Sequence, residues 1–122
     1  MQEIEKNLID FLEKAYELTV LSLKHAQNKD FEQLNSVLEN RERAINIVQS
    51  LSENLALYQQ KMDPKTYTPF NNQVNQVIEK IHSMDEIVMT CLEHEKTKTQ
   101  FQIAKTFKNK ENFKGYNLNK LK

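Results

Sequence analysis

Apolar residues recur at spacings of three and four along three long stretches, which is the period of an α-helix with one buried face. The first stretch covers about residues 2–27 and carries Ile4, Leu8, Phe11, Ala15 and Leu18. The second covers about residues 31–60 and carries Phe31, Leu34, Leu38, Arg41, Ile45, Val48, Ser52 and Leu55. The third follows two prolines and carries Phe70, Val74, Val77, Ile81, Met84, Val88 and Cys91. Short connections between long helices predict an all-α fold, an antiparallel up-down bundle of three long helices.

Helix boundaries are predicted from capping residues. Asp30 followed by Gln33 has the form of an N-cap with a capping-box partner, so the second helix should begin at Phe31. Asp63-Pro64 and Thr68-Pro69 each combine an N-cap residue with a proline at the first helical position. We predict that the third helix begins at Thr68, after a single turn at Pro64.

The chain changes character after Leu92, where eight polar residues follow from Glu93 to Gln100. Apolar residues then return on one face as Phe101, Ala104 and Phe107. Either the third helix extends as an arm, or a short C-terminal fourth helix folds back over the bundle. Because three helices bury only a thin core, back-folding is favoured. We divide the chain into a helical bundle at 1–95 and a basic amphipathic segment with a tail at 96–122.

The amino-acid composition argues against many-stranded, disulfide-bonded and membrane-spanning proteins. One Gly and two Pro in 122 residues are too few for the tight turns of a many-stranded fold. A single Cys excludes an internal disulfide and favours a reducing compartment. The N-terminus lacks the pattern of a signal peptide, and no apolar run reaches the roughly 18 residues of a membrane span. We therefore expect a soluble, cytoplasmic protein without a membrane span.

The net charge is zero, but the two segments carry opposite charge. From Lys96 onward, eight Lys minus one acid (Glu111) give +7, and residues 1–95 carry nine positive and sixteen negative groups, giving −7. Basic residues interleaved with Phe101, Phe107, Phe113 and Tyr116 are one way to bind nucleic acid. However, the basic residues are all Lys, and the acidic bundle of the same chain is a nearer partner. We predict no nucleic-acid partner.

Arg41 interrupts the apolar seam of the second helix, between Leu38 and Ile45. A guanidinium at such a position must reach solvent or find a partner of opposite charge. We expect Arg41 to reach solvent or a carboxylate such as Glu13 or Glu17.

Catalytic and metal-binding patterns are weak. Glu79-Lys80-Ile81-His82 has the Glu-x-x-His form of di-iron bundles, but such a site needs a second copy of the motif and two further carboxylates. Cys91 and His94 supply at most two of the four ligands of a structural zinc site. The only glycine is Gly115, so no glycine-rich phosphate loop exists. We predict that the protein is not an enzyme and binds no metal or cofactor.

Two segments resemble the flagellar export chaperones of the FliT and FlgN group. Residues 11–51 are similar to the first helical hairpin of that family, including the stretch Leu38 to Ile45, in which Leu38, Arg41 and Ala44 are spaced as Leu-x-x-Arg-x-x-Ala. The segment FKNKENFKGYN at residues 107–117 resembles the basic segment ending in Tyr-Asn that follows the bundle in FliT-like proteins. The polar run at 93–100 departs from a seamless bundle.

The resemblance implies a chaperone that holds an unassembled flagellar axial protein, either the filament cap or a hook–filament junction protein, and delivers it to the type III export gate or export ATPase. It also implies that Arg41 or Arg43 is a family feature. It further implies that the C-terminal segment acts in autoinhibition, cargo capture or gate docking, and that Tyr116 matches a tyrosine with that role. Beside the resemblance, the residues suggest a partner helix bound in place of an amphipathic segment. The candidate binding residues are Val74, Val77, Val88, Phe101, Phe107, Phe113 and Tyr116.

A protein of another class remains open, namely a structural helical adaptor or a coiled-coil oligomerisation module without cargo. The apolar stripes are wider than the a and d positions of a two-stranded coil, which favours a closed bundle. The cargo, the family branch and the oligomeric state are not determined by the sequence.

Overall fold

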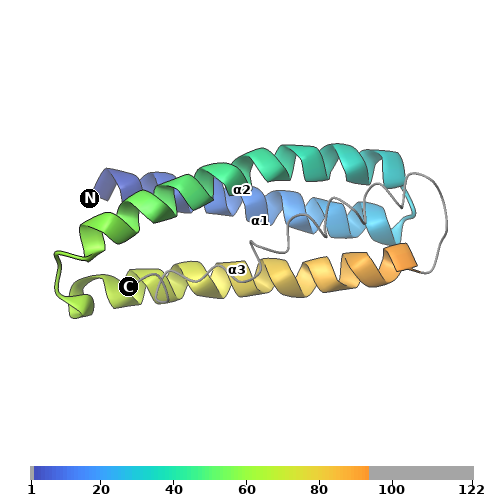
Figure 1. The fold of residues 1–122 in the computed structure, drawn as a ribbon. Coiled ribbons are helices and arrows are strands. Elements are labelled where there is room, and N and C mark those ends of the chain that lie inside the picture. Colours follow the sequence, from blue (N-terminus) through green and yellow to red (C-terminus); the bar gives the residue numbers. More distant parts are fainter. Residues whose placement is uncertain (1, 94–122) are drawn as a thin grey trace.

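The computed structural model describes residues 2–93, and within them it contains three helices and no strand (Figure 1). These are α1 (Gln2–Gln27), α2 (Phe31–Gln59) and α3 (Pro64–Glu93). The predicted all-α class is confirmed, and the first two helices have the predicted bounds to within one residue. The predicted fourth helix or arm lies outside the described residues.

The turn between α1 and α2 is closed by backbone groups rather than by the predicted capping box. Lys29 adopts a left-handed conformation with φ of 59°. The N–H of Asp30 donates to the carbonyl of His25 (2.9 Å), and the N–H of Lys29 donates to that of Ala26 (3.1 Å). This bond pair is the Schellman motif, which satisfies the last carbonyls of a helix. The side chain of Asp30 makes no capping bond and lies 3.7 Å from Nδ1 of His25, so the predicted capping box is wrong.

The third helix begins at Pro64, not at Thr68 as predicted. Asp63 caps it, because its Oδ1 accepts from the N–H of Lys65 (3.0 Å) and its carbonyl accepts from the N–H of Thr66 (2.9 Å). Pro69 therefore lies inside the helix. A proline there removes one bond to the carbonyl four residues earlier, that of Lys65, an exposed residue whose carbonyl water can reach. The first N-cap–proline pair is sufficient to start the helix.

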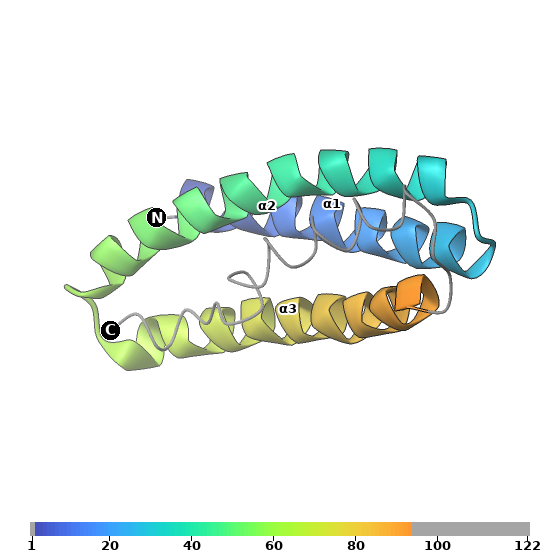
Figure 2. The same cartoon turned by 45° about the vertical axis from the view of Figure 1, so that its right-hand side comes forward.

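Helix α1 is the common neighbour of the other two. Both α2 and α3 pack on α1, more extensively for α2, whereas the backbones of α2 and α3 come close to each other at few points. Figures 1 and 2 show α1 and α3 running in one direction and α2 in the other. The contacts that join α2 to α3 are therefore made by side chains.

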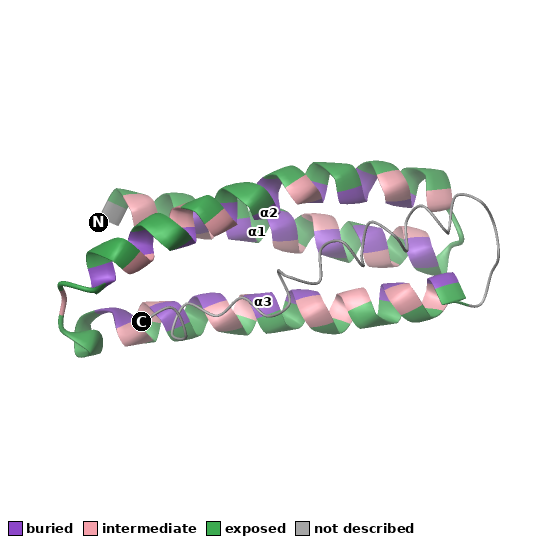
Figure 3. Cartoon of the chain, viewed as in Figure 1, coloured by how far each residue is buried: buried purple, intermediate pink, exposed green. Residues whose placement is uncertain are grey.

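The buried apolar residues form two clusters along the bundle (Figure 3). The larger, called the first core cluster, comprises Leu8, Leu12, Ala15, Ala44, Ile45, Val48, Leu55, Val74, Ile78 and Ile81. The smaller, called the second core cluster, comprises Ala26, Leu34, Leu38, Val88 and Leu92. The second cluster lies at the end where α1 turns into α2 and where α3 ends.

Periodicity predicts the buried face of α2 better than that of α3. Every seam position predicted in α2 is buried except Phe31, which is half-buried. In α3, the predicted Val74, Ile81 and Val88 are buried, whereas the other four stripe residues are only half-buried, namely Phe70, Val77, Met84 and Cys91. Ile78 and Leu92, which the sequence places beside the stripe, are buried. The buried face of α3 is thus rotated by a fraction of a turn from the predicted stripe. It also includes two residues whose side chains carry a polar group, Tyr67 and Asn71.

Ser52 lies fully buried in the α2 seam, and its hydroxyl has no hydrogen-bond partner among residues 2–93. A buried hydroxyl without a partner costs about 1–3 kcal/mol of desolvation. We predict that Ser52→Ala raises the free energy of unfolding by about 1 kcal/mol more than Ser50→Ala does. Ser50 is exposed on the same helix, so its variant corrects for the higher helix propensity of alanine. Urea denaturation measures both, and a Ser52→Ala protein less stable than Ser50→Ala would contradict this account.

Candidate functional site

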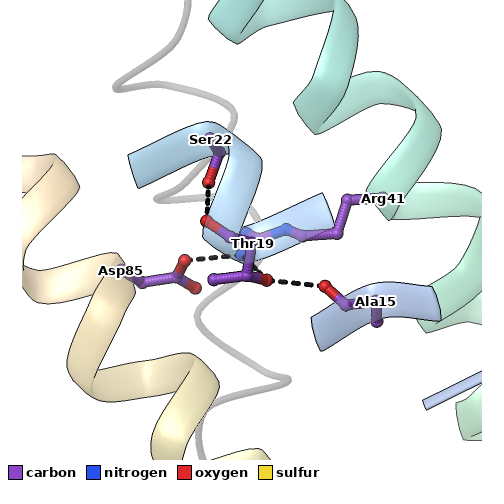
Figure 4. A network of polar contacts seen from close by, with 5 residues as sticks. All are labelled: Ala15, Thr19, Ser22, Arg41 and Asp85. Atoms are coloured by element: carbon purple, nitrogen blue, oxygen red, sulfur yellow. Dashed lines mark hydrogen bonds and ion pairs between the residues drawn. The ribbon is translucent and has the colours of Figure 1, made fainter. Parts of the chain in front are cut away.

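Arg41 is the only buried charged residue within 2–93, with 4% of its surface exposed. Its Nη1 donates to Oδ1 of Asp85 (2.5 Å) on α3 and to Oγ1 of Thr19 (3.1 Å) on α1 (Figure 4). The side chain therefore joins all three helices at one level. An unpaired guanidinium in this position would be strongly destabilising, so the carboxylate of Asp85 is the partner that makes its burial tolerable.

Two hydroxyl residues of α1, Thr19 and Ser22, lie at the same level of the bundle as Arg41. The Thr19 hydroxyl donates to the carbonyl of Ala15 (2.7 Å), which leaves an oxygen lone pair to accept from Arg41. The Ser22 hydroxyl donates to the carbonyl of Thr19 (2.7 Å). Both residues are fully buried. We call Thr19, Ser22, Arg41 and Asp85 the polar layer.

The polar layer separates the two core clusters along every helix. On α1 it falls between Ala15 and Ala26, on α2 between Leu38 and Ala44, and on α3 between Ile81 and Val88. Apolar contact along the bundle is thus interrupted at one level, where the helices are joined by hydrogen bonds and an ion pair.

Arg41 does bind a carboxylate, but not the one expected from the sequence. Glu13 and Glu17 are both exposed, whereas Asp85 is partly buried opposite Arg41, with its side chain 17% exposed. The expectation of a carboxylate partner is confirmed, but Glu13 and Glu17, the two examples named for it, lie on the exposed side of α1 and are not that partner. Arg43, the other arginine of the family-like pattern, is exposed. Of the two candidate arginines, only Arg41 contributes to the interior.

A second polar pair joins α2 to α3 near the turn between them. Nε2 of Gln59 donates to Oδ1 of Asn71, and Nδ2 of Asn71 donates to Oε1 of Gln59, both at 2.9 Å. Both side chains are buried. Each amide provides the other with a donor and an acceptor, which compensates the cost of their burial.

Three of the predicted partner-binding residues lie within residues 2–93. Val74 and Val88 are fully buried in different core clusters, and Val77 is half-buried against the first. Phe101, Phe107, Phe113 and Tyr116 lie outside the described residues. In this conformation the two buried valines face the interior, so a partner helix would reach them only after the bundle opens.

Some large apolar side chains are exposed. On α2, Ile47 and Tyr58 share one side of the helix with half-buried Leu51, and Leu57 is 62% exposed. Ile87 of α3 is exposed as well. Scattered apolar residues are normal on a protein surface and do not by themselves define a binding site.

Within residues 2–93, no group of three or more His, Cys, Asp or Glu side chains is placed to hold a metal ion. Glu79 is exposed and His82 is half-buried, and Cys91 carries a free thiol half-buried against the second core cluster. In the same part of the chain, no helix has the length and apolar character needed to cross a membrane.

Comparison with known proteins found no match. No protein-family model matches the chain, and neither a curated protein nor a solved structure matches it significantly. The resemblance to flagellar export chaperones therefore stays a prediction from the two quoted segments.

We predict that Arg41→Lys lowers the free energy of unfolding by about 1.5–3 kcal/mol. A lysine keeps the charge, but its ammonium is more strongly hydrated than a guanidinium and is therefore more costly to bury between Asp85 and Thr19. The matched control is Arg43→Lys, an exposed site two residues away, which should change stability by less than about 0.5 kcal/mol. Thermal and urea denaturation measure both. Equal effects of the two substitutions would show that Arg41 needs only its charge.

Proposed function

We propose that the protein is a cytoplasmic flagellar export chaperone that binds an unassembled axial protein, the filament cap or a hook–filament junction protein, and prevents its premature assembly before type III export. The proposal rests on the similarity of residues 11–51 and 107–117 to the FliT and FlgN group. The three-helix architecture is compatible with it, because small helical bundles are the fold that the resemblance implies.

The observation that supports a helix-binding function best is the unequal packing of the helices. In a four-helix bundle, each helix lies beside two others. Among the three helices of residues 2–93, α1 has two neighbours, but α2 and α3 each pack extensively only on α1. A fourth helix placed between α2 and α3 would complete the arrangement.

Two occupants of this fourth position are proposed, and they would compete. One is the amphipathic segment of residues 96–122, as a back-folded fourth helix, whose charge of +7 complements the −7 of residues 1–95. The other is an amphipathic helix of the axial protein, bound through apolar anchors at i, i+3 and i+4. A partner that replaces the C-terminal segment shifts a pre-existing equilibrium between closed and open forms.

The energetics of such an exchange are adequate. Burying one large apolar anchor contributes about 1.5–3 kcal/mol, and three or four anchors suffice for micromolar affinity after the costs of association. A competing C-terminal segment would reduce the apparent affinity by the fraction of molecules that are closed. The tail would thereby regulate cargo binding without changing the binding surface itself.

The test is capture of partners from the lysate of the source cell by three baits, namely the full chain, a 1–95 truncation, and the full chain with Phe101, Phe107 and Phe113 changed to Ser. We predict recovery of a filament-cap or junction protein, increased about tenfold, roughly 1.4 kcal/mol, by truncation or by the Phe→Ser changes. The triple variant keeps the tail's charge, so it separates loss of apolar packing from loss of the basic residues.

Circular dichroism must first show that the two full-length baits have the same helix content and that the 1–95 truncation is folded as a helical protein. Recovery of no flagellar protein by any bait would contradict the proposed function. Equal recovery by all three would contradict competition by the tail while leaving the chaperone assignment intact. A rod-like dimer in sedimentation, without cargo, would support the structural adaptor instead.

A further inference from the structure

We infer that the polar layer divides the bundle into two units that open separately, and that the end of α3 beyond Asp85 leaves the bundle first while the first core cluster stays closed. This inference concerns a movement built into the fold and does not depend on the proposed function. It rests on the burial pattern and on the contacts of Arg41.

The two units differ greatly in their apolar contacts. The first core cluster contains ten buried residues drawn from all three helices, including Val74, Ile78 and Ile81 of α3. Among residues 2–93, the second contains five, to which α3 contributes Val88 and Leu92, with half-buried Met89 and Cys91 beside them. Regions with few buried apolar contacts open with the lowest free energy in native proteins.

Within residues 2–93, three sets of contacts hold the end of α3. The backbone of α3 comes close to α2 at few points, so this end is held by α1, by the second core cluster and by the Arg41–Asp85 pair. Once that ion pair breaks, Val88 and Leu92 can separate from Leu34 and Leu38 without disturbing any residue of the first cluster. The ion pair therefore marks the boundary of the opening unit.

The chain contains its own reporter of this movement. Cys91 is the single cysteine of the protein and is half-buried against the second core cluster. Its reaction with a thiol reagent such as dithionitrobenzoate is slowed while α3 is docked and proceeds when the end of α3 leaves. The rate in the full-length protein measures opening without any introduced probe.

The decisive comparison uses two identical substitutions on the same helix, Val74→Ala in the first core cluster and Val88→Ala in the second. Both valines are fully buried. We expect Val88→Ala to speed the labelling of Cys91 by about tenfold or more, and Val74→Ala to change it less than about twofold, although both lower global stability in urea. Labelling that accelerates in proportion to the lost global stability in both variants would overturn the inference.

A second pair of variants tests the boundary. Asp85→Asn removes the charge that faces Arg41 and should speed labelling at least as much as Val88→Ala does. Glu79→Gln makes the same chemical change at an exposed position of α3 and should leave the rate unchanged. An unchanged rate in Asp85→Asn would overturn the assignment of the ion pair as the boundary.

The urea dependence of Cys91 labelling in the wild-type protein tests the inference even if a variant fails to fold. Labelling should depend on urea more weakly than global unfolding does, because opening the end of α3 exposes only part of the buried surface. An equal dependence, which indicates opening only by global unfolding, would overturn the inference. Labelling at the rate of an unfolded thiol, which indicates that the end is never closed, would do so as well.

Discussion

The ion pair between Arg41 and Asp85 is the interaction on which the arrangement of the three helices depends. Helices α2 and α3 each pack on α1, but their backbones come close to each other at few points. The position of α3 relative to α2 therefore depends on the side chains that cross between them. Arg41 reaches both α1, at Thr19, and α3, at Asp85. A guanidinium that is 4% exposed admits few alternative positions for its carboxylate. A buried pair of this kind is weak evidence for stability, since its desolvation offsets most of its attraction. Its contribution is to specify the register of α3 against α2.

The same reasoning applies to Gln59 and Asn71, whose reciprocal amide bonds join α2 to α3 at the other end of the bundle. Apolar seams tolerate sliding and rotation, because one leucine can replace another in a contact at little cost. Two polar pairs at separate levels do not tolerate it, since a shift of one residue would leave buried donors and acceptors without partners. The rotation of α3 that buries Ile78 and Leu92 is the one that brings Asn71 and Asp85 to face α2. Specific hydrogen bonds thus act together with a less specific apolar core.

Periodicity allowed the helices and most buried positions to be predicted, because a 3.6-residue repeat follows from the geometry of a single helix. The seam of α2 illustrates this, because its two polar residues, Arg41 and Ser52, are buried as their positions predict.

Pairings between helices could not be predicted from periodicity. Glu13 and Glu17 were as plausible as Asp85 for Arg41, since a single sequence does not state which helix faces which. Asn71 and Gln59 look like surface residues when taken singly. The start of α3 was misplaced because two N-cap–proline pairs compete and their local patterns are alike. The candidate binding residues beyond 93 lie outside the described structure and stay predictions.

The central claim is that Arg41 and Asp85 interact directly and thereby join α2 to α3, and a double-mutant cycle tests it most directly. Arg41→Met, Asp85→Leu and the double variant would be unfolded in urea beside the wild type. The account predicts strong coupling, in which the double variant is at least about 1.5 kcal/mol more stable than the sum of the single effects implies, because each single change leaves the other polar group buried without its main partner. Effects that add to within about 0.5 kcal/mol would show that the two side chains are energetically independent and would contradict the claim.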